Sequence, residues 1–301
     1  METLKDLLKK PEHFAPGHRT CRGCAIPIIV RSVLRATDNP LVVVNATGCM
    51  EVTTTLYPQT SWNMPYIHNA FENAPATMSG ILAIYQHLKE KKQISEDVKF
   101  VVFGGDGSTY DIGLQSLSGA WERGDNFLYV CYDNQVYSNT GGQRSSATPL
   151  GASTSTTPAG KIESRKDIMK IAAAHNLPYL AQAAIHNWFD LHQKAKKAFN
   201  TNGPTFLNIL CPCVANWKYN SDLTVKMSQL ATETCFWPLY EIENGVYKLN
   251  YQPREKLPVE EFLKFQGRFK NLFSSKDKNN LIKIQQEIDK RWQELTGKCP
   301  R

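Results

Sequence analysis

Two polar residues that could bind a cation follow two apolar runs of the sequence. Asp106 lies in a Gly-Gly-Asp-Gly segment directly after residues 98–103, and Asn134 follows residues 127–132. A helical pattern separates the runs, which predicts one βαβ unit with parallel strands. Both residues would then lie just beyond the carboxyl ends of strands, where open α/β sheets bind ligands. Carboxylate and amide oxygens are suitable ligands of Mg²⁺, and phosphate groups often complete its coordination.

The glycines beside Asp106 suit the same chemistry. Gly105 and Gly107 would let the backbone approach a diphosphate group closely, and the amino end of the following helix favours negative charge. The alternative is an ordinary turn between a strand and a helix, in which Gly-Asp-Gly is common. The second polar residue at the matching strand end, Asn134, favours a ligand site.

Cysteines supply a second set of candidate ligands. The chain has eight, of which the Cys21-x-x-Cys24 pair, Cys49 and a later cysteine form a four-thiolate set. Four thiolates bind tetrahedral zinc or a [4Fe–4S] cluster, and the spacing does not distinguish these. Reduced structural cysteines are a third interpretation, because free cysteines are commonly buried. Cys131 lies inside a predicted strand, which indicates a core position.

Alternating strand and helix patterns must position these residues. The expected strands cover residues 41–44, 98–103, 127–132, 179–183 and 205–210, and the expected helices residues 1–15, 27–34, 72–91, 168–175 and 188–199. This alternation predicts an α/β protein with a doubly wound, mostly parallel sheet. We expect residues 1–234 to form this domain. Residues 235–301 form a C-terminal extension, with a strand at 246–249 and a helix at 277–295, that packs on the core or a partner subunit.

A long polar stretch, residues 137–161, follows Asn134 and is rich in Ser, Thr and Gly. A flexible linker between domains is one interpretation. Long loops inside compact domains are usually functional, which favours an ordered loop at the active site.

Composition and charge argue against several classes of protein. Hydrophobic residues make up 42% and charged residues 21% of the 301-residue chain, which is typical of globular proteins. No apolar run approaches the ~20 residues that span a bilayer. The charged amino-terminal segment is unlike a secretory signal, so we expect a cytoplasmic protein with no membrane partner. The net charge of +7 comes from scattered lysines without a basic stripe, so no nucleic-acid partner is expected.

Residues 134–143, Asn-Gln-Val-Tyr-Ser-Asn-Thr-Gly-Gly-Gln, narrow these possibilities. Gly-Asp-Gly followed by Asn at this spacing resembles the signature of proteins that bind thiamine diphosphate and Mg²⁺. The continuation resembles the β subunit of the pyruvate:ferredoxin oxidoreductase (pyruvate synthase) family. The resemblance covers about residues 15–217 and implies the thiamine diphosphate-binding fold.

The resemblance implies a role for each candidate residue near the cofactor. The side chains of Asp106 and Asn134 and the carbonyl group of Val136 would bind Mg²⁺. Gly105, Gly107 and Ser108 would lie along the diphosphate group. Asn139 would be catalytic and face both substrate and thiazolium ring, although Ser-Asn-Thr-Gly is also good turn chemistry.

The cysteines also gain roles from the resemblance. A [4Fe–4S] cluster near the thiamine would be held by Cys21, Cys24, Cys49 and Cys213, and Cys49 would also border the cofactor. Cys211 lies two residues before Cys213 and is the competing fourth ligand.

The implied activity is the oxidative decarboxylation of pyruvate with coenzyme A to acetyl-CoA, CO₂ and reduced ferredoxin; the reverse reaction fixes CO₂. In this family the carboxylate that activates thiamine lies on a different subunit. The chain would therefore act only with α-, γ- and δ-type partner subunits and ferredoxin. The alternatives are the same chemistry on a branched-chain 2-oxoacid or oxalate, a non-oxidative thiamine-dependent decarboxylase or synthase, and a zinc-stabilised binding module.

Overall fold

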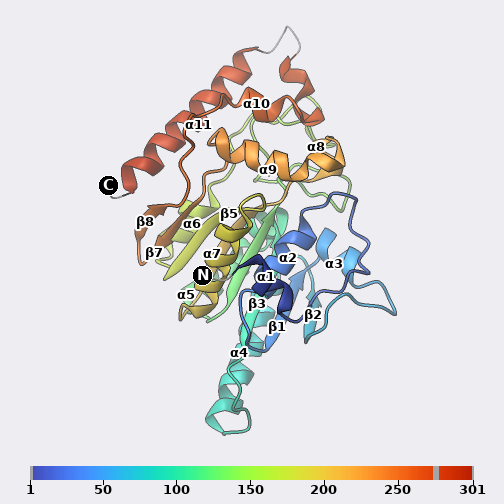
Figure 1. Ribbon diagram of the computed structural model, residues 1–301, viewed down its shortest axis with the longest axis vertical. Helices are drawn as coiled ribbons and strands as arrows, with labels where there is room; N and C mark the ends of the chain where they lie inside the picture. Colours follow the sequence, from blue (N-terminus) through green and yellow to red (C-terminus); the bar gives the residue numbers. More distant parts are fainter. Residues whose placement is uncertain (1–2, 274–277, 300–301) are drawn as a thin grey trace.

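A central β-sheet flanked by helices organises the computed structural model of the protein, which describes residues 3–273 and 278–299 (Figure 1). The strands within these residues are β1 (Leu41–Ala46), β2 (Tyr66–Asn69), β3 (Lys99–Gly105), β4 (Leu128–Asp133), β5 (Tyr179–Ala184), β6 (Thr205–Leu210), β7 (Tyr240–Glu243) and β8 (Val246–Leu249). They form one sheet in the order β2-β1-β3-β4-β6-β5-β7-β8.

Helices connect most of these strands. The α-helices of the described residues are α1 (Leu4–Lys9), α2 (Ile26–Leu34), α3 (Cys49–Thr54), α4 (Ala74–Glu90), α5 (Leu114–Glu122), α6 (Ile168–Ala174), α7 (Trp188–Asn200), α8 (Val214–Trp217), α9 (Thr224–Glu233), α10 (Glu260–Leu263) and α11 (Lys278–Lys298). A π-helical turn, η1 (Gly107–Ile112), precedes α5, and two 3₁₀ turns are η2 (Ser221–Leu223) and η3 (Gly267–Phe273).

The first six strands in this order, β2, β1, β3, β4, β6 and β5, are parallel to one another. The last two, β7 and β8, form an antiparallel edge. The prediction of a doubly wound, mostly parallel sheet is confirmed. β3 and β4 are neighbours, with Gly105 paired to Tyr132, so the predicted βαβ unit is also confirmed.

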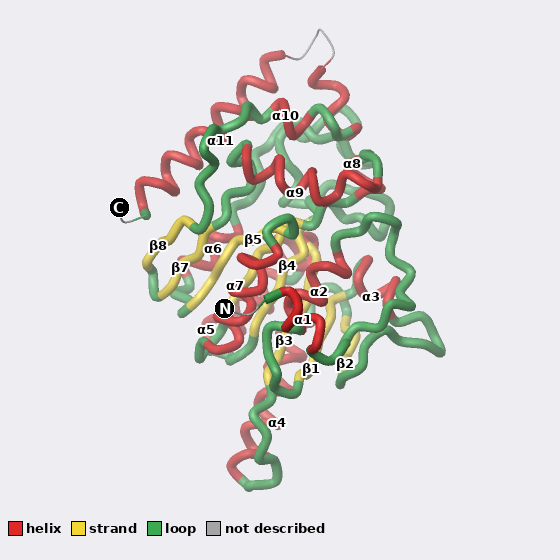
Figure 2. Tube along the Cα trace, viewed as in Figure 1, coloured by secondary structure: helices red, strands yellow, loops and turns green. Residues whose placement is uncertain are grey.

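Both faces of the sheet are buried, which explains the nearly continuous apolar runs of the central strands. Successive residues of a strand point to opposite faces. Phe103 accordingly packs in the cluster that α2 and α7 complete, and Val102 in the cluster of α4 and α5. Figure 2 shows the strands enclosed by helices, with α4 extending away from the sheet.

Some elements differ from their expected bounds. The first helix covers only Leu4–Lys9, because Pro11 cannot continue a helix. Strand β2 is not evident in the sequence, because Tyr66–Asn69 is a short edge strand with two polar residues and a single partner. The edge position removes the need for apolar residues on both faces.

The described residues of the C-terminal extension pack on the α/β core. β7 pairs with β5, and Ile284 and Ile288 of α11 join an apolar cluster with Trp217 and Leu210. The expected helix began at Asp277, which lies outside the described residues. None of the helices in the part of the chain described here is long and apolar enough to cross a membrane.

Phe206 tests the packing of the sheet. Its side chain is 0% exposed and lies edge-on to Trp121. We expect Phe206→Ala to lower the free energy of unfolding by about 3–5 kcal/mol, because it leaves a cavity in the core. Ile84→Ala, at a residue 62% exposed on α4, should change it by less than about 0.5 kcal/mol. Urea denaturation measures both values, and equal effects would contradict this assignment of the core.

Candidate active site at the carboxyl edge of the sheet

The carboxyl ends of β3 and β4 bring Asp106 and Asn134 together. Both residues follow directly from strands that are hydrogen-bonded neighbours. One atom of the Asn134 side-chain amide lies 2.9 Å from Oδ1 of Asp106 and 2.6 Å from the carbonyl oxygen of Val136. The three residues singled out from the sequence as Mg²⁺ ligands therefore converge on one point.

The Asn134 amide has two orientations, which differ in the atom that faces Asp106 and Val136. With its nitrogen toward them, the amide donates to both oxygens, and its own oxygen accepts from Ser138 Oγ at 3.0 Å. With its oxygen toward them, the nitrogen donates to Ser138 Oγ and three oxygens converge. Converging oxygens without a proton between them repel one another unless a cation lies there. A cation bound at this point would therefore require the second orientation.

The environment of Asp106 also suits a cation. Its side chain is 1% exposed. Burial raises the pKa of Asp106 well above its usual range, and the charge of Asp133 raises it further. Its carboxylate accepts a hydrogen bond from the hydroxyl of Ser145, which carries no charge. Because a buried carboxylate is costly without a countercharge, a bound cation would stabilise its ionised form.

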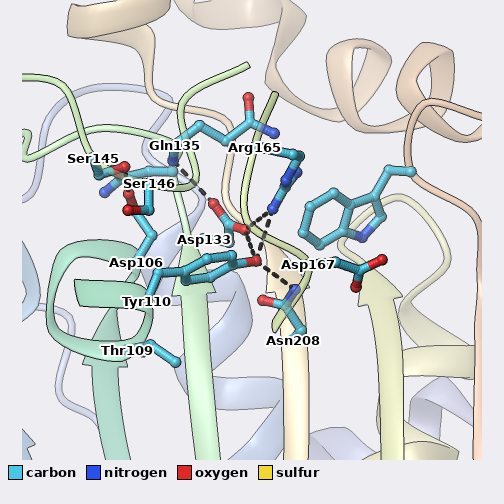
Figure 3. Close-up of polar contacts among 12 residues, drawn as sticks. Asp106, Thr109, Tyr110, Asp133, Gln135, Ser145, Ser146, Arg165, Asp167 and Asn208 are labelled. Carbon is cyan, nitrogen blue, oxygen red and sulfur yellow. Dashed lines mark hydrogen bonds and ion pairs between the residues drawn. The ribbon is translucent and has the colours of Figure 1, made fainter. Parts of the chain in front are cut away.

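Asp133, the last residue of β4, anchors the turn that follows it (Figure 3). Its Oδ2 accepts hydrogen bonds from Arg165 and from the Tyr110 hydroxyl, both at 2.6 Å. Its Oδ1 accepts from the backbone N–H of Gln135 at 3.1 Å. Gln135 has a φ of 65°, a left-handed conformation that is unfavourable for a residue with a Cβ atom. The Asp133 network holds this conformation in place.

The C-terminal extension supports the same turn. Arg268 is 3% exposed and donates to Oε1 of Gln135 at 2.7 Å. Its guanidinium carbon lies 4.0 Å from the centre of the Trp217 ring. Trp217 Nε1 in turn donates to the backbone oxygen of Asn134 at 2.8 Å. Residues far apart in the chain therefore fix the position of Asn134.

A cleft opens beside the converging oxygens. Its lining includes every residue expected along the thiamine cofactor, namely Cys49, Gly105, Asp106, Gly107, Ser108, Asn134, Val136 and Asn139. The Ser108 hydroxyl donates to the backbone oxygen of Phe71 at 2.6 Å. A Cβ atom at Gly107 would collide with the Tyr137 ring, which explains the need for glycine there. Asn139 is exposed in the turn at the mouth of the cleft.

Tyr132 is a cleft residue that the sequence analysis did not identify. Its side chain is buried, and no hydrogen-bond partner of its hydroxyl lies among the described residues. A Cβ atom at Gly48 would lie 2.7 Å from that hydroxyl, so Gly48 leaves room for it. Its position inside an apolar strand gave no signal of a polar role.

The loop at residues 137–161 packs against the site. Ser145, Thr148 and Lys161 are buried in it, and Ser145 contacts Asp106. Thr148 Oγ1 donates to the backbone oxygen of Gln135 at 2.8 Å. These contacts favour the active-site loop over the interdomain linker.

The four cysteines of the expected cluster lie near this cleft. Cys21 precedes α2, Cys49 begins α3, and Cys213 immediately precedes α8. Burial raises the pKa of Cys24 to about 12, and the charges that the other three thiols would carry raise it as well. Burial likewise raises the pKa of Cys49 to about 11, with Cys213 and Cys21 contributing. Thiolates gathered in this way need positive charge, which a metal supplies.

The described thiols lie near one another, but they are not arranged as a complete metal-binding site. In residues 3–273 and 278–299, no three His, Cys, Asp or Glu side chains have the arrangement needed to hold a metal ion. Cys213 is partly exposed and accepts from Asn216 Nδ2 at 3.4 Å. Cys211 is buried in the apolar cluster beside β6. Cys131 is buried in β4, so the prediction of a core position is confirmed.

Comparison with known proteins identifies the class of protein to which this chain belongs. Residues 46–209 match the family described as thiamine pyrophosphate enzyme, C-terminal TPP binding domain. The match extends from the end of β1 into β6, so it includes both strands that carry Asp106 and Asn134. This part of the chain is a thiamine pyrophosphate-binding domain.

Full-length relatives define the family more closely. The chain is 50% identical over 298 residues to pyruvate synthase subunit PorB of Thermotoga maritima, covering 95% of this chain and 92% of the relative. It is 47% identical over 289 residues to pyruvate synthase subunit PorB of Methanocaldococcus jannaschii, covering 94% and 96%. The chain belongs to the PorB family of pyruvate synthase subunits, which confirms the resemblance found in its sequence.

A solved structure supports the fold. The 2-oxoglutarate:ferredoxin oxidoreductase from Magnetococcus marinus matches 73% of this chain and 78% of its own, with a TM-score of 0.55 and 19% identity. At this identity the likeness concerns the fold alone.

Arg165→Met tests the support of the turn by Asp133. The substitution leaves the buried carboxylate without its countercharge, so the free energy of unfolding should fall by about 3–5 kcal/mol. The backbone N–H of Gln135 should also exchange with solvent faster, because its acceptor loses its anchor. Hydrogen–deuterium exchange measures the second effect.

Lys170→Met is the matched control, because Lys170 forms an exposed pair with Glu294. Its effect on unfolding should stay below about 1 kcal/mol, with unchanged exchange at Gln135. If exchange at Gln135 is equal in both variants, Arg165 does not support the turn.

Proposed function

We propose that this chain is the thiamine diphosphate-binding subunit of a pyruvate:ferredoxin oxidoreductase. The observation that carries the proposal is the convergence of oxygens from Asp106, Asn134 and Val136, in a member of the PorB family. In an octahedral Mg²⁺ site with Mg–O distances of ~2.1 Å, neighbouring oxygens lie about 3.0 Å apart. The separations of 2.9 and 2.6 Å found here are close to that value.

The residues of the cleft then have distinct tasks. Asp106, Asn134 and the Val136 carbonyl group would hold Mg²⁺, and Gly105, Gly107 and Ser108 would border the diphosphate group. Thiamine diphosphate supplies an electron sink for decarboxylation of a 2-oxoacid when it is bound. Asn139, exposed at the mouth of the cleft, would contact the substrate.

The cysteine set would carry electrons away from this site. We assign a [4Fe–4S] cluster to Cys21, Cys24, Cys49 and Cys213. The electrostatic influence of these thiols on one another supports a shared site. Cys211 also interacts with Cys24, Cys49 and Cys213, so the choice of Cys213 rests on its partial exposure, whereas Cys211 is buried. Cys49 lines the cofactor cleft as well, so the cluster would lie next to the thiamine.

The chain would not complete the reaction alone. The relatives are named as subunits of pyruvate synthase. As the resemblance in the sequence implies, the proposed enzyme includes α-, γ- and δ-type subunits and is cytoplasmic. It converts pyruvate and coenzyme A to acetyl-CoA and CO₂, and it passes electrons to ferredoxin.

The test is anaerobic purification of the enzyme with its native partners, followed by iron and sulfide analysis and EPR spectroscopy. We expect iron for a four-iron cluster on this chain, together with a radical or reduced-cluster signal after addition of pyruvate and coenzyme A. A signal with a branched-chain 2-oxoacid and none with pyruvate would support the alternative substrate. Zinc in place of iron would contradict the proposal.

The fourth cysteine ligand has its own test. We expect Cys213→Ser to lose most of the cluster iron, because a hydroxyl is a poor ligand for iron–sulfur clusters. Cys211→Ser is the matched control, two residues away, and should retain the iron with a lower stability. Iron analysis of both purified enzymes distinguishes the assignments, and the opposite pattern would make Cys211 the ligand.

A further inference from the structure

Ser138 connects the oxygen site with the cysteine set. Its Oγ lies 3.0 Å from the Asn134 amide and 3.1 Å from Sγ of Cys49. Asn134 is a proposed ligand of Mg²⁺ and Cys49 a proposed ligand of the cluster. One hydroxyl group therefore contacts a ligand from each site.

The number of protons restricts what this hydroxyl can do. A serine hydroxyl donates a single proton and accepts through its oxygen. When the Asn134 nitrogen faces Ser138, the hydroxyl accepts from it and keeps its own proton for the sulfur of Cys49. When the Asn134 oxygen faces Ser138, the hydroxyl gives its proton to that oxygen, and none remains for the sulfur.

The orientation that frees the proton is also the orientation of the cation site. The Asn134 oxygen then faces Asp106 and Val136, as a bound cation requires. Cation binding and donation to the Cys49 sulfur thus belong to one hydrogen-bond arrangement.

We propose that Ser138 is a positioning residue that couples the two sites: a cation bound beside Asn134 directs the Ser138 hydroxyl proton to the sulfur of Cys49. This inference rests on the proposed function, because it takes Mg²⁺ and the cluster as occupants of the two sites.

Two consequences follow from the coupling. Hydrogen bonds to ligand sulfurs help to set the reduction potential of an iron–sulfur cluster, and a donated proton raises it by withdrawing charge. Loading the enzyme with Mg²⁺ and thiamine diphosphate should therefore raise the cluster potential partly through Ser138. Loss of the hydroxyl should also weaken Mg²⁺ binding, because the cation orientation loses two hydrogen bonds of Ser138, to Asn134 and to Cys49, whereas the other orientation loses one.

The experiment uses the complete enzyme with three substitutions. Ser138→Ala removes the hydroxyl, and Ser138→Thr retains one. Thr140→Val is the matched control, because the Thr140 hydroxyl lies in the same turn and bonds Gln143 instead. Two quantities are measured: the Mg²⁺ concentration that half-saturates thiamine diphosphate binding, and the midpoint potential of the cluster with and without Mg²⁺ and thiamine diphosphate.

We expect Ser138→Ala to raise the half-saturating Mg²⁺ concentration about tenfold, the effect of losing one hydrogen bond to a ligand group. Its cluster potential should become more negative, and the shift on loading should be smaller than in the wild type. Ser138→Thr should recover both properties, and Thr140→Val should match the wild type.

A Ser138→Ala enzyme with wild-type Mg²⁺ affinity and potential would overturn the inference. Equal changes in Thr140→Val would also overturn it, since they would reflect the turn and not the hydroxyl. A wild-type enzyme that lacks iron, or binds thiamine diphosphate without Mg²⁺, would instead contradict the proposed function.

Discussion

The proposed function depends on one electrostatic constraint: when the Asn134 oxygen faces Asp106 and Val136, three oxygens converge without a proton between them, and a cation would stabilise that arrangement. Asp106 and Asn134 meet because β3 and β4 are adjacent and parallel, and Val136 follows two residues later. All three residues are buried at the carboxyl edge of the sheet, and burial strengthens the repulsion between acceptors and the attraction for a cation. A cation bound there would compensate the carboxylate that burial otherwise disfavours.

Supports from distant parts of the chain hold this geometry. Asp133 cannot serve as a second ligand, because Arg165 and Tyr110 occupy its carboxylate from one direction and Gln135 from another. The two neighbouring buried carboxylates therefore have different roles. Asp133 is held by its hydrogen bonds, whereas Asp106 remains able to bind a cation. Arg268, from the expected C-terminal extension at residues 235–301, also contacts this turn, so residues after the predicted domain contribute to the shape of the site.

The sequence revealed the fold and the ligands more readily than their supports. Asp106 and Asn134 could be predicted because strand ends are marked by where apolar runs stop, and the parallel crossover then places them together. Arg268 could not, since its contact with Gln135 joins positions 133 residues apart and no periodicity encodes such a pair. The spacing of the cysteines left zinc and iron–sulfur chemistry equally open, because both use four thiolates.

Calorimetric titration of the metal-free full-length protein with thiamine diphosphate, with and without Mg²⁺, tests the central claim most directly. The account predicts binding that requires Mg²⁺, is abolished by a chelator, and is lost in Asp106→Ala. Binding of equal strength without a divalent cation, or in Asp106→Ala, would show that the three oxygens do not hold a cation for the cofactor.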